Sequence, residues 1–293
     1  MKGILLAGGK GTRLYPSTLG VSKQLLPVYN KPMVYYPLTT LMLSGIRDIL
    51  VISMPDDLPG YMRLLDTGAQ WGIRLEYASQ PKALGLADAF RVGRRFLEGE
   101  PASALILGDN LFYGNDLSDQ VREAARAAEK GGAVIFGYPV RDPERYGVVE
   151  LGAKGHPMSL EEKPKSPRSN LAVPGLYFYD RTVLSRVDRL CPSPRGELEI
   201  TDLNRLYLEE GALQVQVFRR GMAWLDAGTH ESLLDASNFI RAVEDRQGLM
   251  VGCPEEVAWR MGWIGREKLA GRAQVHQGTA YGSYLEHLST EAR

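Results

Sequence analysis

Two aspartates in this chain each follow an apolar stretch. Asp109 ends the run Ala104-Leu-Ile-Leu-Gly-Asp109, and Asp226 ends Trp224-Leu-Asp226. In open α/β sheets, ligands bind outside the carboxyl ends of the strands. Mg²⁺ needs only one or two protein carboxylates, because phosphates and water fill its other positions. The two acids therefore predict a magnesium site, and the alternative is that each aspartate caps a turn.

A glycine-rich segment follows the first apolar strand. Gly8, Gly9 and Gly11 are followed by Thr12 and Arg13, and Lys23 comes ten residues after Arg13. Glycine lets backbone N–H groups approach a ligand closely, and two cations suit a phosphate chain. The segment predicts a cradle for a triphosphate, although it matches neither the dinucleotide fingerprint nor the P-loop. A tight turn with surface charges is the alternative.

An acid–base cluster lies in the middle of the chain, where Glu161, Glu162 and Lys163 precede a proline. Glutamate accepts hydrogen bonds from sugar hydroxyls, and lysine is a point charge for a phosphate. The cluster therefore fits a phosphorylated sugar, but a solvated charged turn is the commoner fate of such a run. The acidic segment 195–202 also has two interpretations: its acids could bind the substrate, or they could favour the N-terminus of the helix that follows.

Composition and charge exclude several other classes of protein. The 35 basic and 35 acidic residues balance, which excludes a strongly basic nucleic-acid binder. No apolar run approaches the ~18 residues that a membrane span needs, and the N-terminus has no signal-peptide pattern. Cys191 and Cys253 match no disulfide or metal spacing. We expect a cytoplasmic protein that binds neither nucleic acid nor membranes.

The pattern of elements predicts the scaffold that positions these groups. Strands and helices alternate in the first half, which indicates a mostly parallel sheet covered by helices on both faces. The expected strands there are 3–7, 49–54, 73–77, 104–107 and 133–137, with helices at 32–43, 86–97 and 117–128. The second half is less regular. It predicts strands at 147–151, 176–179 and 213–219, a helix at 201–209 capped by Thr201, and helices from 230 onward.

The order of the motifs carries the argument further. The chain resembles the sugar nucleotidyltransferases, and within them the branch that transfers a thymidylyl group to glucose 1-phosphate. The resemblance covers nearly the whole chain and rests on Leu6–Pro16, 22–27, 31–33, 108–114, 142–149, 161–164, 196–202 and 224–228.

The resemblance implies a fold, a division of the chain and a reaction. The fold is a Rossmann-like, three-layer, mostly parallel mixed sheet with a small helical C-terminal part. Residues 1–229 form the core, whose nucleotide half is 1–130 and whose sugar-phosphate half is 131–229, and 230–293 form a helical extension. With Mg²⁺, dTTP and glucose 1-phosphate would give dTDP-glucose and pyrophosphate, the first step of dTDP-deoxysugar synthesis. A homotetramer with feedback inhibition by dTDP-rhamnose is also implied.

The resemblance assigns roles to single residues. Catalysis falls to Arg13, Lys23 and Lys163, and Mg²⁺ to Asp109 and Asp226. The nucleotide would be bound by Gly8, Gly11, Gln24, Gln80, Gly85 and Asp109. The sugar phosphate would be bound by Tyr146, Gly147, Glu162, Lys163, Val173 and Tyr177. A regulatory site near a subunit contact would use Tyr113, Gly114 and Arg219.

One segment departs from the family's pattern. Ala83 and Leu84 stand before Gly85, where a proline and a polar residue are usual. Thymine differs from uracil by one methyl group, which contributes about 1–3 kcal/mol in a pocket, so we expect activity with UTP as well. Two alternatives stay open: a uridylyl- or other nucleotidylyltransferase, and a non-catalytic nucleotide-sugar sensor.

Overall fold

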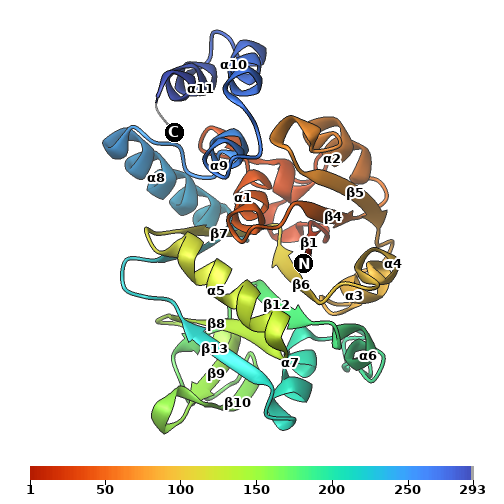
Figure 1. Ribbon diagram of the computed structural model, residues 1–293. Helices are drawn as coiled ribbons and strands as arrows, with labels where there is room; N and C mark the ends of the chain where they lie inside the picture. The colour runs from red at the N-terminus through yellow and green to blue at the C-terminus, as the bar shows by residue number, and fades with distance from the viewer. Residues whose placement is uncertain (292–293) are drawn as a thin grey trace.

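The computed structural model describes residues 1–291, and within them a ten-stranded mixed sheet runs through most of the chain (Figure 1). Its strands lie in the order β10-β9-β11-β8-β12-β6-β1-β4-β5, and β13 pairs with β8. Their bounds are β1 Lys2–Leu6, β4 Asp48–Ser53, β5 Arg74–Ser79, β6 Ala102–Leu107, β8 Ala133–Pro139, β9 Gly147–Leu151, β10 Pro157–Glu162, β11 Leu171–Ala172, β12 Leu176–Asp180 and β13 Leu213–Val217.

The two ends of this sheet differ in strand direction. Strands β6, β1, β4 and β5 are parallel to one another, and β6 pairs antiparallel with β12 on its other side. At the other end, β8 to β12 pair antiparallel, except that β13 is parallel to β8. Two small ribbons lie apart from the sheet: β2 (Pro27–Val28) with β3 (Lys31–Pro32), and β7 (Asn110–Tyr113) with β14 (Ala223–Asp226).

Helices cover both faces of the sheet, because successive side chains of each buried strand point to opposite sides. In β1, Leu5 packs into one core with α1, α2, α5 and α9, whereas Ile4 and Leu6 pack into a second core with α3, α4, α6 and α7. The helices of the first core are α1 (Tyr35–Leu43), α2 (Leu58–Leu65), α5 (Leu117–Lys130) and α9 (Pro254–Arg260). The helices of the second core are α3 (Asp88–Val92), α4 (Arg94–Leu97), α6 (Val183–Val187) and α7 (Ile200–Glu209). The predicted mixed α/β class is confirmed.

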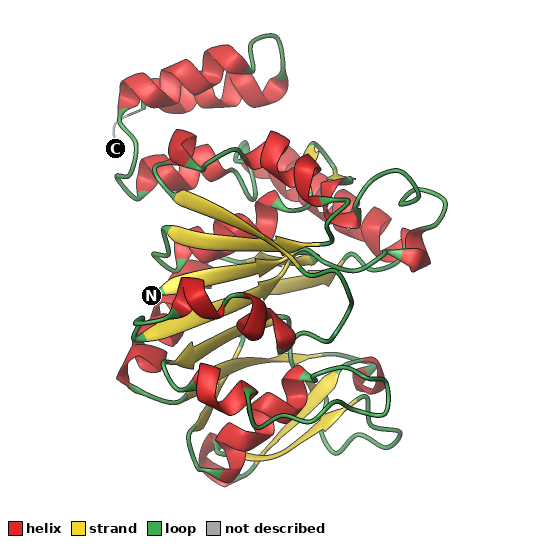
Figure 2. Ribbon diagram, turned by 90° about the vertical axis from the view of Figure 1, so that its right-hand side faces the viewer, coloured by secondary structure: helices red, strands yellow, loops and turns green. Residues whose placement is uncertain are grey.

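The C-terminal helices follow the last strand. Helix α8 (His230–Gln247) begins at a capping box in which Thr229 and Ser232 exchange hydrogen bonds. Helices α10 (Arg266–Val275) and α11 (Ala280–Thr290) pack on each other at one end of the molecule (Figures 1 and 2). The last two residues of the predicted extension lie outside the described residues. Among residues 1–291, no helix combines the length and apolar character needed to cross a membrane.

Several predicted boundaries are wrong for identifiable reasons. The helix expected at 32–43 begins at Tyr35, because Lys31–Pro32 pairs in a ribbon. The helix expected at 86–97 is split at Gly93, because glycine loses more conformational freedom in a helix than any other residue. The predicted strand 213–219 ends at Val217.

The expected cap at Thr201 is also wrong. Glu199 is the N-cap of α7, and Thr201 lies inside the helix, where its hydroxyl donates to Glu162.

Candidate functional site

The ribbon formed by β7 and β14 brings the two aspartates of the sequence analysis to one place. Asp226 pairs directly with Asn110, the residue after Asp109. The backbone N–H of Ala227 also donates to the Asp109 carbonyl over 3.3 Å. The two acids thus share one short antiparallel ribbon at the end of β6, although 117 residues separate them in the chain.

Asp109 is held as a charged group by a lysine. Lys23, in the short helical turn Lys23–Leu25, forms an ion pair with its Oδ2 atom, and Asn110 Nδ2 donates to its Oδ1 atom over 3.0 Å. Burial alone would raise the pKa of Asp109, but the Lys23 charge and these hydrogen bonds outweigh burial and lower it. Asp109 is therefore an anion in this site.

Asp226 has the opposite electrostatic character. Burial, followed by repulsion from Asp109, raises its pKa, although Lys23, Arg13 and Arg145 partly offset this. A divalent cation beside both carboxylates would relieve that repulsion. Within residues 1–291 no cluster of three or more metal-binding side chains occurs. Two carboxylates suffice for Mg²⁺ when substrate phosphates supply the remaining oxygens, so this donor set fits the ion.

Asn110 joins the parts of the site and was not singled out as a site residue from the sequence. Its Nδ2 holds Asp109, while its Oδ1 accepts from Trp224 Nε1 over 2.7 Å and from the Gly175 N–H over 2.9 Å. The only sequence signal was its place directly after Asp109.

The glycine segment after β1 lies against the same acids. Arg13 lies in the turn Thr12–Leu14, which begins after Gly11 at φ +58°. A Cβ at Gly228 would meet Arg13 Nη2 at 2.9 Å and Asp226 Oδ1 at 3.0 Å. The Arg13 guanidinium and the Asp226 carboxylate therefore both pack closely against Gly228.

Gln24 supports the glycine segment. Its Oε1 accepts from the hydroxyls of Ser22 and Tyr61, each over 3.1 Å, and its Nε2 donates to the Gly8 carbonyl over 3.3 Å. The Gln24 carboxamide therefore fixes the backbone at Gly8. Gln24 was predicted to bind the nucleotide, and this contact gives it a supporting role as well.

A cavity of about 390 Å³, the acidic cavity, opens in front of the two aspartates. Glu162 accepts from Thr201 Oγ1 over 2.7 Å, and the Lys163 N–H donates to the Tyr146 carbonyl over 3.0 Å. Lys163 has φ +44°, unusual for a lysine, and its side chain is 53% exposed. The predicted residues that line this cavity are Arg13, Asp109, Tyr146, Gly147, Glu162, Lys163, Val173, Tyr177 and Asp226.

A second cavity of about 200 Å³, the Gln80 cavity, lies on the other side of Asp109. Leu86, Leu107 and Asp109 line both cavities. The Gln80 cavity is also lined by Gly8, Gln24, Gln80, Ala83, Gly85 and Glu197. The two cavities therefore form one site with two lobes, and Asp109 stands where they meet.

Gly85 closes the Gln80 cavity against the loop before α7. It has φ +100°, and a Cβ there would lie 2.3 Å from the Leu198 carbonyl oxygen. The Leu198 N–H donates to the Leu84 carbonyl over 2.7 Å, and the Ala87 N–H donates to the Leu198 carbonyl over 3.1 Å. This backbone pairing joins the 84–87 segment to the acidic loop that lines the other lobe.

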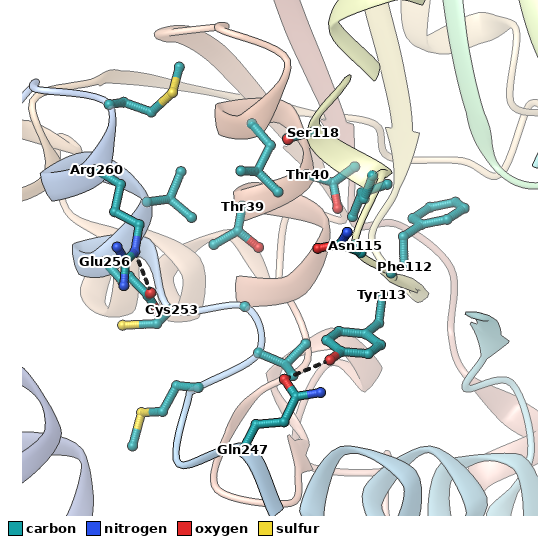
Figure 3. Close-up of a pocket in the computed structure, with 18 of the residues that line it drawn as sticks. Thr39, Thr40, Phe112, Tyr113, Asn115, Ser118, Gln247, Cys253, Glu256 and Arg260 are labelled. Atoms are coloured by element: carbon teal, nitrogen blue, oxygen red, sulfur yellow. Dashed lines mark hydrogen bonds and ion pairs between the residues drawn. The ribbon is translucent and has the colours of Figure 1, made fainter. Parts of the chain in front are cut away.

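A third cavity of about 740 Å³, the distal cavity, lies between α1, α5, β7 and the segment that carries α9. It contains Tyr113, whose hydroxyl donates to Gln247 over 2.9 Å, and the Arg260–Glu256 ion pair at 2.7 Å (Figure 3). Tyr113 and Gly114 line it as predicted for a regulatory site, but Arg219 does not. Arg219 pairs instead with Asp116 over 3.4 Å.

The structure thus gathers most of the predicted site residues and adds others. Lys23 lines neither lobe but reaches the site through Asp109, and Gly11 packs against Lys23. The lining residues not assigned a site role from the sequence include Asn110, Thr201, Asn204 and Trp224. Thr201, Asn204 and Trp224 had no sequence signal apart from lying in or beside motifs, since their contacts are made across elements distant in the chain.

Comparisons with known proteins agree with this arrangement. The family model described as nucleotidyl transferase matches residues 2–243. The glucose-1-phosphate thymidylyltransferase of Neisseria gonorrhoeae is 55% identical over 288 residues, covering 98% of this chain and 99% of that protein. That of Mycobacterium tuberculosis is 56% identical over 288 residues, with the same coverage.

Solved structures also share the fold. A Bacillus anthracis crystal structure, described as a candidate glucose-1-phosphate thymidylyltransferase in complex with sucrose, matches with a TM-score of 0.76 and 41% identity. The match covers 82% of this chain and 95% of that one. A UDP-glucose pyrophosphorylase complexed with UDP-glucose matches with a TM-score of 0.70 at 23% identity, over 84% and 99% of the two chains, and shows the fold alone.

Proposed function

The chain belongs to the nucleotidyl transferase family, as its motifs predicted, and from this premise we propose that it transfers a thymidylyl group from dTTP to glucose 1-phosphate. The products are dTDP-glucose and pyrophosphate. Formation of dTDP-glucose is then the first step of a dTDP-deoxysugar synthesis such as that of dTDP-rhamnose.

The observation that carries this proposal is the meeting of the two lobes at Asp109. A bond between a nucleotide α-phosphate and a sugar phosphate needs two ligands bound side by side, with charge neutralisation at the junction. Asp109 lies at that junction and forms an ion pair with Lys23, and Arg13 and Asp226 lie beside it. The nucleotide occupies the Gln80 lobe, and the sugar phosphate occupies the acidic lobe.

The chemistry asks little more of the protein than positioning and charge. The phosphate of glucose 1-phosphate has a second pKa of about 6, so its oxygen attacks the α-phosphorus in line without a dedicated base. Arg13 and Lys23 neutralise the triphosphate, and Lys163 holds the attacking phosphate. Glu162 accepts hydrogen bonds from sugar hydroxyls and is itself held by Thr201. Asp109 and Asp226 would hold Mg²⁺, which when bound offsets the negative charge that gathers on the phosphates.

The thymidylyl reading is preferred over the uridylyl one because of the relatives. Those named for thymidylyl transfer are 55–56% identical to this chain over 98% of its length. The UDP-glucose pyrophosphorylase structures are 22–23% identical. A non-catalytic sensor would need neither carboxylate, and this chain has both.

Product analysis tests the proposal. The full chain is incubated with Mg²⁺, dTTP and glucose 1-phosphate, and both pyrophosphate and the sugar nucleotide are measured. We expect dTDP-glucose and pyrophosphate in equal amounts, and neither product when one substrate is left out. A folded protein that makes no sugar nucleotide from these substrates contradicts the proposal.

We further propose that the distal cavity binds a nucleotide sugar and that the chain works as a homotetramer. The cavity is larger than either lobe of the site and carries Arg122 and Arg260 for a diphosphate, with Tyr113 for a ring. Exposed apolar side chains on the C-terminal helices, Leu234 at 62% and Val275 at 67%, offer surface for association.

Inhibition kinetics and mass measurement test these two points. dTDP-rhamnose should inhibit even at saturating glucose 1-phosphate, and Arg260→Ala should weaken that inhibition without changing turnover. Purely competitive inhibition contradicts the second site. A monomer mass by light scattering contradicts the tetramer.

The division of the chain and its location complete the proposal. Residues 1–130 bind the nucleotide, 131–229 the sugar phosphate, and 230–293 form a helical extension. Both cysteines are free thiols, which suits a cytoplasmic, reducing location.

A further inference from the structure

One buried contact in the Gln80 cavity is not used by the reaction. Gln80 Nε2 donates a hydrogen bond to Asp88 Oδ2 over 2.8 Å. Each of these two residues is 6% exposed. Within residues 1–291, no arginine, lysine or histidine forms an ion pair with Asp88, and its side chain makes no other hydrogen bond. Burying a carboxylate whose only side-chain hydrogen bond comes from a neutral amide costs free energy.

The chemistry of the pair fixes which way the carboxamide faces. A carboxylate only accepts hydrogen bonds, so the NH₂ group of Gln80 must be the part that faces Asp88. The carbonyl oxygen, Oε1, is then turned away from Asp88. It lies 3.7 Å from where a Cβ would stand at Gly8, another residue of the cavity wall. The backbone beneath is fixed as well, because the Gln80 N–H donates to the Ser53 carbonyl over 2.8 Å.

This orientation presents a defined pattern to a base in the cavity. Oε1 is an acceptor, and the second hydrogen of the NH₂ group remains available beside it. An acceptor next to a donor matches a ring N–H next to a carbonyl, which thymine and uracil both carry. It opposes cytosine, whose ring nitrogen at that place is an acceptor and whose neighbouring group is an amine. With the carboxamide reversed, the same glutamine would match cytosine.

We propose that Asp88 is a positioning residue that fixes the Gln80 carboxamide and thereby makes the site select thymine over cytosine. The inference rests on the proposed function, since it assumes that the base occupies the Gln80 cavity. It deepens that function by naming a residue outside the cavity wall that sets base choice through another side chain.

Kinetics with two nucleotides test the inference. The values of kcat and KM for dTTP and for dCTP are measured at saturating glucose 1-phosphate for the wild-type chain and for Asp88→Asn. An asparagine offers both a donor and an acceptor, so it holds Gln80 in either orientation. We expect the dTTP/dCTP ratio of kcat/KM to fall by about tenfold or more. A raised KM for dTTP should carry most of the change, with kcat within about threefold of wild type.

A double-mutant cycle shows whether Asp88 acts through Gln80. In a Gln80→Leu background, Asp88→Asn should leave the dTTP/dCTP ratio unchanged. Asp119→Asn is the matched control, because Asp119 is an exposed acid in the first turn of another helix, and it should keep the wild-type ratio. If Asp88→Asn does not fold, Asp88→Ser gives the same test with a smaller side chain.

The outcomes separate this inference from the proposed function. An active wild type whose ratio is unchanged by either Asp88 substitution overturns the inference alone, as does a ratio that falls equally in the Gln80→Leu background. A folded wild type that makes no product with any nucleotide overturns the proposed function, and this inference with it.

Discussion

Trp224 Nε1 donates a hydrogen bond to Asn110 Oδ1 over 2.7 Å. Trp224 lies two residues before Asp226, and Asn110 directly follows Asp109. The contact therefore ties together the two strands that carry the acids, in addition to their backbone pairing. Asn110 also donates to Asp109, so one carboxamide sets the position of one acid and anchors the strand of the other.

Replacing Asn110 should damage catalysis more than folding. Asn110→Ala removes the donor to Asp109 and leaves the Trp224 and Gly175 N–H groups without their acceptor. Side chains that orient metal-binding groups typically contribute 10–100-fold, so we expect kcat to fall by about that factor. Turnover and thermal unfolding would be compared with Asn170→Ala, which removes an exposed carboxamide. Equal turnover in the two variants contradicts this role of Asn110.

Lys163 should be needed for turnover but not for the fold. Its side chain is 53% exposed and lies 3.8 Å from Glu162, so a surface ion pair is all that the fold loses in Lys163→Ala. We expect turnover to be abolished and the unfolding temperature to stay within a few degrees. Lys165→Ala, two residues away and exposed, is the matched control. Turnover like that of wild type in the Lys163 variant would refute the assignment.

Much of the fold was predictable because it follows from local pattern. The strand at 3–7 is a short continuous apolar run and the helix at 117–128 has an apolar stripe, and both appear within a few residues of the expected bounds. The predictions that failed concern residues whose contacts are made with segments distant in the chain. Thr201 resembles a helix cap, but Glu162, 39 residues earlier, takes its hydroxyl.

The site was predictable as motifs but not as a network. Asp109 and Asp226 stand out as acids after apolar runs, whereas their pairing depends on a ribbon between segments 117 residues apart. Arg219 was grouped with Tyr113, yet the fold turns it to Asp116. The Gln80–Asp88 contact had no sequence signal at all, since its meaning appears only when both residues are buried together.

Asp226 should lower the stability of the folded protein although turnover requires it. Burial and Asp109 raise its pKa in the folded protein, and an acid whose folded pKa is raised costs stability at every pH at which it is ionised. Asp226→Asn removes that cost, so we expect a higher unfolding temperature at pH 7 together with loss of turnover.

Mg²⁺ gives the complementary measurement. It should raise the unfolding temperature of the wild type with bound nucleotide, by linkage, and EDTA should reverse the rise. The Asp226→Asn variant should respond much less. A lower unfolding temperature in the variant, or an equal response to Mg²⁺, contradicts the metal assignment.

Asp180 should make stability depend on pH. It accepts hydrogen bonds from the N–H groups of Gly132 and Thr182 and from the Tyr207 hydroxyl over 2.7–3.0 Å. The Thr182 hydroxyl also donates to Asp180 Oδ1. Burial alone would raise the pKa of Asp180, but the Thr182 hydroxyl, followed by the other hydrogen bonds, lowers it.

An acid with a lowered folded pKa adds stability above its unfolded value of 3.8, and this contribution is lost as the pH falls through the folded value. Asp180→Asn should therefore unfold at a lower temperature than wild type at pH 7, and the gap should narrow below about pH 4. A gap that does not change between pH 7 and pH 3 is inconsistent with this account.

The most direct test of the whole account is pyrophosphate release from the purified chain with Mg²⁺, glucose 1-phosphate and each of dTTP, UTP, GTP, CTP and ATP in turn. We expect the fastest release with dTTP, and slower release with UTP by about 10–200-fold, since one methyl group separates the two bases. Fastest release with a different nucleotide would contradict the thymidylyl assignment, and no release with any of the five from folded protein would contradict nucleotidyl transfer to glucose 1-phosphate itself.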